Sequence, residues 1–207
     1  MPYYPVNLDL RNRKCVVVGG GAVAERKVQS LLGFGAAVLV VSPALTPRLS
    51  ELAAAGRIDH IEAEYHAEPL DDTFLVIGAT DDRETNKRIS LDAQGRGILV
   101  NIVDDRELST FFVPASVRRG DLVISVSTSG NSPAMARRLR EELESRYGPE
   151  YGQLADLLGK LRDEVKARYA DTAERNRAFV RILDSDALRL LAEGKSDQAL
   201  ETARKCI

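Results

Sequence analysis

The stretch Lys14-Cys15-Val16-Val17-Val18-Gly19-Gly20-Gly21-Ala22-Val23-Ala24 decides the fold of this chain. The run over residues 14–18, apolar and largely β-branched after Lys14, is typical of a buried strand, and the three glycines that follow interrupt it. Apolar residues then recur at helical spacing from Ala24 to Leu32. The stretch therefore predicts a strand, a glycine turn and a helix.

A second apolar run, Val38–Val41, ends at Ser42-Pro43 and completes a βαβ unit within about 30 residues. Continuous apolar strands belong to parallel sheets that helices cover on both faces. The alternation continues with helices expected over 45–55 and 83–94 and strands over 58–61, 74–78 and 97–103. We therefore predict an α/β fold with a Rossmann-type parallel sheet.

The pattern changes at Pro114. Two β-rich runs, residues 111–113 and 122–126, flank a turn-like segment at 118–121 and predict an antiparallel pair. Ser132 is the expected N-cap of a following helix, and from residue 149 only helical spacing remains. We predict a Rossmann domain over 1–113, a small α+β dimerisation and substrate-loop segment over 114–148, and a C-terminal helical domain over 149–207.

Composition narrows the class of protein. The chain has 207 residues, 44% of them hydrophobic, and a net charge of −2, so we expect neither a nucleic-acid nor a membrane partner. No apolar run approaches the roughly 20 residues of a membrane helix. Cys15 and Cys206 form no paired motif, and Cys15 is expected to be a buried, reduced thiol. These features indicate a cytoplasmic protein, and the edges of the predicted β pair favour a homodimer.

Residues 19–24 fit the pattern GxGxxA between a strand and a helix, which is typical of NAD-binding domains. Gly19 would permit the tight turn, Gly21 would let a pyrophosphate approach the backbone, and Ala24 would allow close packing. The start of the helix favours an anion. A purely structural glycine turn is the alternative.

The second strand ends at Ser42 instead of the acidic residue that binds the ribose in many NAD sites, and no arginine follows at once to bind a 2′-phosphate, although Arg48 lies nearby. We favour NAD over NADP. Asp81 and Asp82 follow a strand, and helix capping is the favoured role for this pair. The predicted cofactor-binding residues are Gly19, Gly21, Ala22, Val23, Ser42, Pro43, Ala44, Ala79, Thr80, Asp81 and Val103.

Asp104 and Asp105 follow the last predicted strand, at the sheet edge where a nicotinamide would lie. A carboxylate there could accept a proton while a hydride leaves a substrate. Capping of a turn is an equally open interpretation. His60 and His66 lack the spacing of a metal site, so we predict no metal ligands.

The loop from Ser127 to Ser132 combines hydroxyls, a glycine and an amide before a helix, which suits carboxylate or phosphate binding. Arginines 118, 119, 137, 138 and 140 lie close by in sequence and suggest a polyanionic small molecule, although such runs are also typical of solvated faces. The predicted substrate-binding residues are Thr128, Ser129, Gly130, Asn131, Ser132, Arg118 and Arg137.

Four motifs together resemble the precorrin-2 dehydrogenase family, which includes the N-terminal module of siroheme synthase. They are residues 18–27, 79–82, 101–104 and 127–134, and the likeness covers about residues 3–147, with a helical tail that also suits the family. Thr128 stands where the family pattern often has serine. The resemblance implies NAD-dependent oxidation of precorrin-2 to sirohydrochlorin in siroheme biosynthesis.

The resemblance further implies a homodimer whose middle segment forms the interface, an acid or base role for Asp104, and substrate contacts from residues 128–132. The eight carboxylates of precorrin-2 would give the arginines a partner. Two alternatives stay open: insertion of iron into sirohydrochlorin, as in some relatives, and an NAD-sensing regulatory module without catalysis.

Overall fold

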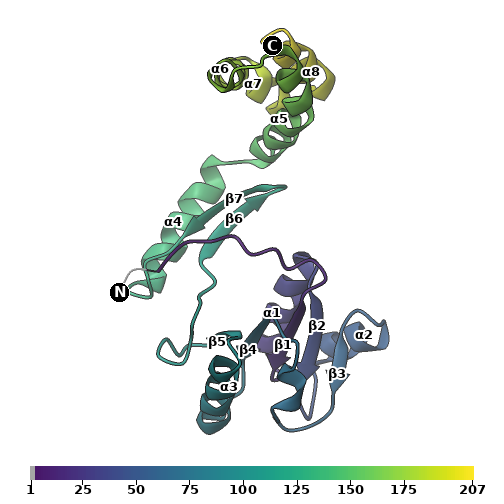
Figure 1. The fold of residues 1–207 in the computed structure, drawn as a ribbon, viewed down its shortest axis with the longest axis vertical. Coiled ribbons are helices and arrows are strands. Elements are labelled where there is room, and N and C mark those ends of the chain that lie inside the picture. The colour runs from purple at the N-terminus through teal and green to yellow at the C-terminus, as the bar shows by residue number, and fades with distance from the viewer. Residues whose placement is uncertain (1–2) are drawn as a thin grey trace. The chain divides into compact units, whose positions relative to one another are not determined.

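The computed structural model describes residues 3–207, so Met1 and Pro2, at the start of the predicted Rossmann domain, lie outside it. The chain forms two compact units that divide between Val113 and Pro114 (Figure 1). The further division of the second unit at residue 148 stays a prediction.

The first unit is built on a five-stranded parallel sheet with the order β3-β2-β1-β4-β5. Its strands are β1 (Lys14–Val18), β2 (Ala37–Val41), β3 (Asp59–Ile61), β4 (Leu75–Gly78) and β5 (Leu99–Ile102). The chain runs outward from β1 to β3 on one side and then crosses to β4 on the other side of β1. The order therefore reverses at β1, where Rossmann folds bind ligands beyond the carboxyl ends of the strands. This confirms the predicted Rossmann-type sheet.

Helices cover both faces of this sheet, as the continuous apolar strands predicted. On one face, α1 (Ala22–Gly33) and α2 (Pro47–Ala54) contribute Ala24, Val28 and Leu49 to a core with the strands. On the other face, α3 (Arg83–Gly95) and the 3-10 turn η1 (Glu68–Leu70) form a second core (Figure 1). The sheet therefore lies between two packed layers, which hold the carboxyl ends of its strands in place.

Cys15 lies in β1 and is fully buried. Burial raises the pKa of its thiol to about 11, because the charged thiolate loses its hydration there. The thiol is therefore neutral near pH 7, and the sequence prediction of a buried cysteine is confirmed.

The predicted strand at residues 111–113 is wrong. The antiparallel hairpin of the second unit pairs β6 (Ala115–Arg119) with β7 (Leu122–Val126). Residues before Pro114 instead run along β5, where the Thr110 and Phe111 amides donate to Val100 O. Proline has no N–H to continue a ladder, so the hairpin strand begins only beyond it.

Helices complete the second unit: α4 (Pro133–Arg146), α5 (Pro149–Arg168), α6 (Thr172–Leu183), α7 (Ala187–Ala192) and α8 (Ser196–Arg204). Ser132 caps α4, since its Oγ accepts from the Met135 amide at 3.2 Å, as the sequence predicted. Leu161 and Ile182 are fully buried in the core that α5 shares with the last three helices. The tail after residue 149 is helical, as predicted.

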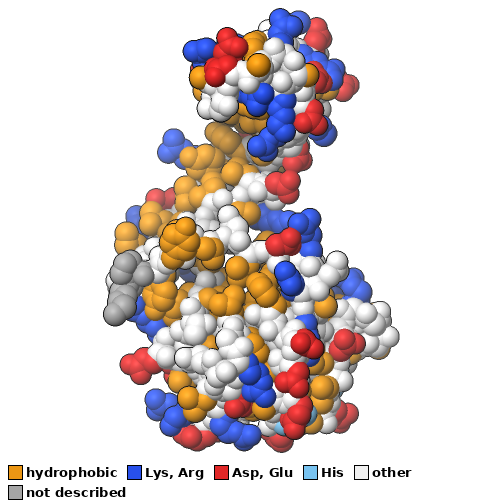
Figure 2. Space-filling view, in the orientation of Figure 1, with side chains coloured by type: hydrophobic (Ala, Val, Ile, Leu, Met, Phe, Trp, Pro, Cys, Tyr) orange, Lys and Arg blue, Asp and Glu red, His pale blue; other side chains and the backbone are white. Residues whose placement is uncertain are grey.

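The visible surface mixes both signs of charge, without a large area of one sign (Figure 2). This distribution agrees with the near-zero net charge of the chain. Among residues 3–207, no helix has the length and apolar character needed to cross a bilayer.

We predict that Gly20→Ala destabilises the first unit. A Cβ at this position would lie 1.9 Å from Ala44 O, a backbone atom that cannot move without shifting the loop after β2. The expected loss is about 2 kcal/mol or more of unfolding free energy, measured by urea denaturation. Gly33→Ala is the control, because a Cβ there meets no atom within 4 Å among the described residues and alanine favours a helix. Equal stability of both variants would contradict the prediction.

Candidate functional site

Two glycines bring three loops into backbone contact at the end of β1. Gly19 has a φ of +114°, and a Cβ there would lie 2.4 Å from Ala79 O. Its amide donates to Val41 O at 2.9 Å, and Gly20 O accepts from the Thr46 amide at 3.0 Å. The turn is therefore packed directly against the segments that follow β2 and β4. The need for glycine at residue 20 was missed from the sequence, because the GxGxxA pattern leaves that position free.

Gly21 differs from its two neighbours. It caps α1 with extended backbone angles, φ −83° and ψ −175°, and no side chain caps this end of the helix. A Cβ built on Gly21 meets nothing within 4 Å among the described residues. The protein itself therefore does not require glycine here. The open space and the unpaired amides of the first turn fit a pyrophosphate that approaches the backbone.

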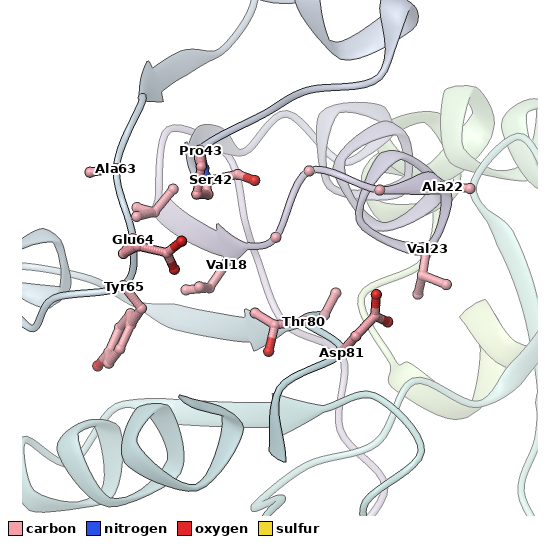
Figure 3. Close-up of a pocket in the computed structure, with 15 residues that line it drawn as sticks. Val18, Ala22, Val23, Ser42, Pro43, Ala63, Glu64, Tyr65, Thr80 and Asp81 are labelled. Atoms are coloured by element: carbon pink, nitrogen blue, oxygen red, sulfur yellow. The ribbon is translucent and has the colours of Figure 1, made fainter. Parts of the chain in front are cut away.

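The glycine turn opens into a pocket of about 350 Å³ beyond the carboxyl ends of β1, β2 and β4 (Figure 3). All the predicted cofactor residues line it except Ala44 and Val103. The lining comprises Val18, Gly19, Gly20, Gly21, Ala22, Val23, Val41, Ser42, Pro43, Ala63, Glu64, Tyr65, Ala79, Thr80 and Asp81. Ala63, Glu64 and Tyr65 were not predicted from the sequence. The feature of the sequence that could have predicted them is their position just after β3, a strand of the same parallel sheet.

Ser42 is buried and turned toward its own loop. Its hydroxyl donates to Ala44 O at 2.8 Å, and the Ala44 amide lies 3.4 Å from the same oxygen. Nε2 of His60 donates to Ser42 O at 2.9 Å. The hydroxyl proton is therefore already used within the protein, and Ser42 shapes the pocket wall more than it offers a donor to a ligand.

The two aspartates after β4 have different roles. Asp82 caps α3, because its Oδ2 accepts from the Thr85 amide at 2.8 Å, and this interaction with Thr85 lowers the pKa of Asp82. Asp81 is exposed and lines the pocket with Thr80 (Figure 3). Capping is thus confirmed for Asp82, whereas Asp81 is left facing the cavity.

The two aspartates after β5, Asp104 and Asp105, also have different roles. Asp105 caps the following turn, since its Oδ1 accepts from the Glu107 amide at 3.0 Å and the Leu108 amide at 3.1 Å. Asp104 is exposed in the left-handed region with a φ of +59°. Its carboxylate makes no hydrogen bond to any described residue, so it is the member of the pair that can meet a substrate.

Lys27 of α1 is an electrostatic neighbour of Asp104 that the sequence analysis did not single out. Burial lowers the pKa of the Lys27 ammonium, Arg26 lowers it further, and the negative charge of Asp104 acts in the opposite direction. Asp104 therefore faces a cation at the flank of the helix that begins at the glycine turn.

In the second unit, hydrogen bonds between residues of the Ser127–Ser132 loop hold the loop in one conformation. Thr128 Oγ1 donates to Ser132 O and accepts from the Ser132 amide, both at 3.1 Å. Ser129 and Gly130 have φ values of +54° and +81°, which turn the chain sharply. Thr128 and Ser132 thus hold the loop in shape, while Asn131 is exposed.

The five arginines that were singled out in the sequence of this unit already have partners. Arg119 donates to Tyr147 O at 3.0 Å and Glu144 O at 3.1 Å, which satisfies carbonyls at the end of α4. Its role is structural. Arg137 pairs with Glu141 at 3.1 Å along an exposed helix face. Such surface pairs contribute only about 0.3–0.5 kcal/mol, so a ligand carboxylate could replace the glutamate. Arg118 donates to Gly120 O at 3.1 Å.

Neither histidine lies in a cluster of metal-ligand type. Nδ1 of His66 donates to Glu64 O at 3.0 Å, and His60 bonds to Ser42 O. Within residues 3–207 there is no group of three His, Cys, Asp or Glu side chains that could hold a metal ion.

Comparison with known families finds three consecutive matches. Residues 6–115 match a family described as putative NAD(P)-binding. Residues 119–146 match the central region of sirohaem biosynthesis proteins, and residues 150–206 match the sirohaem synthase dimerisation region. The matches cover both units of the structure.

Individual relatives agree with these families. The chain is 40% identical over 207 residues to the siroheme synthase of Chromobacterium violaceum, covering 100% of this chain and 44% of that protein. It is 38% identical over 208 residues to that of Escherichia coli, covering 100% of this chain and 46% of the relative. The chain therefore spans less than half the length of these relatives.

A solved structure resembles the whole chain. The precorrin-2 dehydrogenase SirC superposes with a TM-score of 0.80 at 29% sequence identity, over 98% of this chain and 100% of SirC. The NAD(P)-binding match covers more than half of the chain, and the two sirohaem-specific regions follow it in order. The chain belongs to this NAD(P)-binding family, and its second unit carries two sirohaem-specific regions, in agreement with the precorrin-2 dehydrogenase family that its motifs resemble.

Proposed function

We propose that this protein oxidises precorrin-2 to sirohydrochlorin with NAD, as a step of siroheme biosynthesis. The observation that carries the proposal is the open space at Gly21, where the uncapped start of α1 meets a pocket of about 350 Å³. The likeness to SirC supports the choice of substrate. The sirohaem-specific regions in the second unit support the pathway.

The pocket would hold the cofactor across the point where the strand order reverses. The amides of Gly21 to Val23 would bind the pyrophosphate, because they lie at the uncapped helix start. Ser42 and Pro43 follow β2 and would flank the adenosine half, whereas Thr80 and Asp81 follow β4 and would flank the nicotinamide half. When bound, NAD supplies the acceptor for the hydride that leaves the substrate.

Asp104 is our proposed proton acceptor. The oxidation removes one hydride and one proton from precorrin-2, and the hydride passes to the cofactor. The carboxylate of Asp104 would take the proton and release it to water, since the side chain is exposed and no described residue holds it by a hydrogen bond. Lys27 places a positive charge near this carboxylate.

The loop at residues 128–132 and the exposed Arg118 and Arg137 would bind the carboxylates of the tetrapyrrole. Support comes from the sharp turn at Ser129 and Gly130 and from the weak surface pairing of Arg137. Thr128 would act by keeping the loop closed, because both interactions of its hydroxyl are with Ser132.

A homodimer is part of the proposal. The interface was predicted in residues 114–148, and the match to a dimerisation region lies at residues 150–206, so both assign assembly to the second unit. We also propose a cytoplasmic location, which the two free cysteines, Cys15 and Cys206, support. Sedimentation velocity checks the assembly, and a monomer at micromolar concentration would contradict it.

We predict that Gly21→Asp abolishes NAD binding and leaves the fold intact. The aspartate would enter open space, so the protein has no steric reason to unfold, but its charge and bulk would occupy the pyrophosphate position. Calorimetric titration with NAD measures the effect, and circular dichroism checks the fold. An NAD affinity at the wild-type level would contradict the assignment of this pocket as the NAD site.

We predict that Asp104→Asn slows precorrin-2 oxidation about 100-fold or more while NAD affinity stays unchanged, because the amide cannot accept the proton. Asparagine tolerates the left-handed conformation, so the backbone is retained. Asp72→Asn is the matched control: Asp72 has a φ of +57° and does not line the cofactor pocket. Near-wild-type turnover of Asp104→Asn would show that another group takes the proton.

The direct assay follows NADH and sirohydrochlorin together under anaerobic conditions. One NADH per sirohydrochlorin is expected. Binding of NAD without oxidation of precorrin-2 would favour the regulatory module instead. Sirohydrochlorin supplied with Fe²⁺ tests the alternative chelatase activity, which is rejected if insertion is no faster than without protein.

A further inference from the structure

Glu64 is an acidic side chain in the cofactor pocket that the sequence analysis did not predict. It lies in the segment between β3 and η1 and lines the pocket with Ala63 and Tyr65. Figure 3 shows its carboxylate pointing into the pocket, on the same side of the glycine turn as Ser42 and opposite Thr80 and Asp81. The Glu64 carboxylate forms no hydrogen bond with any described residue, so it is available to a ligand.

The protein holds this segment from both ends. Before Glu64, Ile61 O accepts from the Ser42 amide at 3.1 Å and the Ala63 amide at 3.0 Å, which ties the segment to the end of β2. After it, Tyr65 is buried and its hydroxyl donates to Asp92 Oδ2 at 2.9 Å, on α3. Burial, followed by this interaction with Asp92, raises the pKa of Tyr65, so the phenol stays a donor. Glu64 is therefore presented from an anchored position.

The position of Glu64 corresponds to the adenosine half of a bound dinucleotide. In the sheet, β3 lies beside β2, and β4 lies on the far side of β1. In Rossmann domains the residue at the end of β2 contacts the adenosine ribose. Glu64 enters the pocket from the strand next to β2, so it approaches the same sugar.

The usual acidic partner of that ribose is absent from β2. Ser42 stands there, and its hydroxyl proton already bonds to Ala44 O. The described lining of the pocket also contains neither lysine nor arginine, which a 2′-phosphate would need. Among the described lining residues on the β2 and β3 side of the pocket, Glu64 is thus the only charged side chain.

We propose that Glu64 selects NAD over NADP. Its carboxylate accepts hydrogen bonds from the adenosine ribose hydroxyls and repels a 2′-phosphate at the same place. This inference rests on the proposed function, in which the pocket binds a nicotinamide dinucleotide.

The test compares the dissociation constants of NAD and NADP by calorimetric titration for the full chain and its variants. For Glu64→Gln we expect NAD binding to weaken about tenfold and NADP binding to strengthen about tenfold, because the variant loses one charge close to the ribose. Glu64→Lys should favour NADP further. Glu62→Gln is the matched control, since Glu62 is an exposed glutamate of the same segment that does not line the pocket.

The outcomes separate the two proposals. A wild-type preference for NAD that falls in Glu64→Gln and persists in Glu62→Gln supports the inference. If the wild type binds NAD but the ratio of the two constants is the same in Glu64→Gln, the inference is overturned and the dehydrogenase proposal stands. If the wild type binds neither dinucleotide, the proposed function itself fails.

Discussion

The site depends on backbone contacts that only residues without a Cβ allow. Gly19 and Gly20 place the end of β1 against the carbonyls of Ala79 and Ala44, which belong to loops after β4 and β2. These contacts bring three segments that are distant in sequence to one point at the carboxyl edge of the sheet. Gly21 follows with empty space beside it. The same short turn therefore assembles the pocket and leaves room for an anion at the helix start.

Carboxylates lie on both sides of this turn. The side formed by β4 and β5 carries Asp81 and Asp104, and the side formed by β2 and β3 carries Glu64. An uncapped helix start lies between them and favours the anionic centre of a dinucleotide. In the proposed function, Glu64 would lie at the sugar, Asp104 at the reacting ring and the peptide amides at the phosphates, and this pattern fits a cofactor with a single central anionic group.

Each pair of neighbouring aspartates combines a structural and an available carboxylate. Asp82 and Asp105 accept amide hydrogens of the turns that follow them. Asp81 and Asp104, one residue earlier, remain exposed. A carboxylate that caps reaches amides two or three residues ahead, so the second aspartate of each pair is placed to cap, and the first is left at the strand end.

The sequence by itself determined the parallel sheet, the glycine turn and the N-cap at Ser132, because period, turn chemistry and capping are local properties. Only the tertiary structure decided what depends on neighbours in space. It placed the hairpin strand beyond Pro114, since residues 110 and 111 bond to β5. It also required glycine at residue 20 and brought Glu64 into the pocket beyond the carboxyl ends of the strands. These contacts join segments that are far apart in the sequence. The spacing of residues along the chain therefore does not predict them.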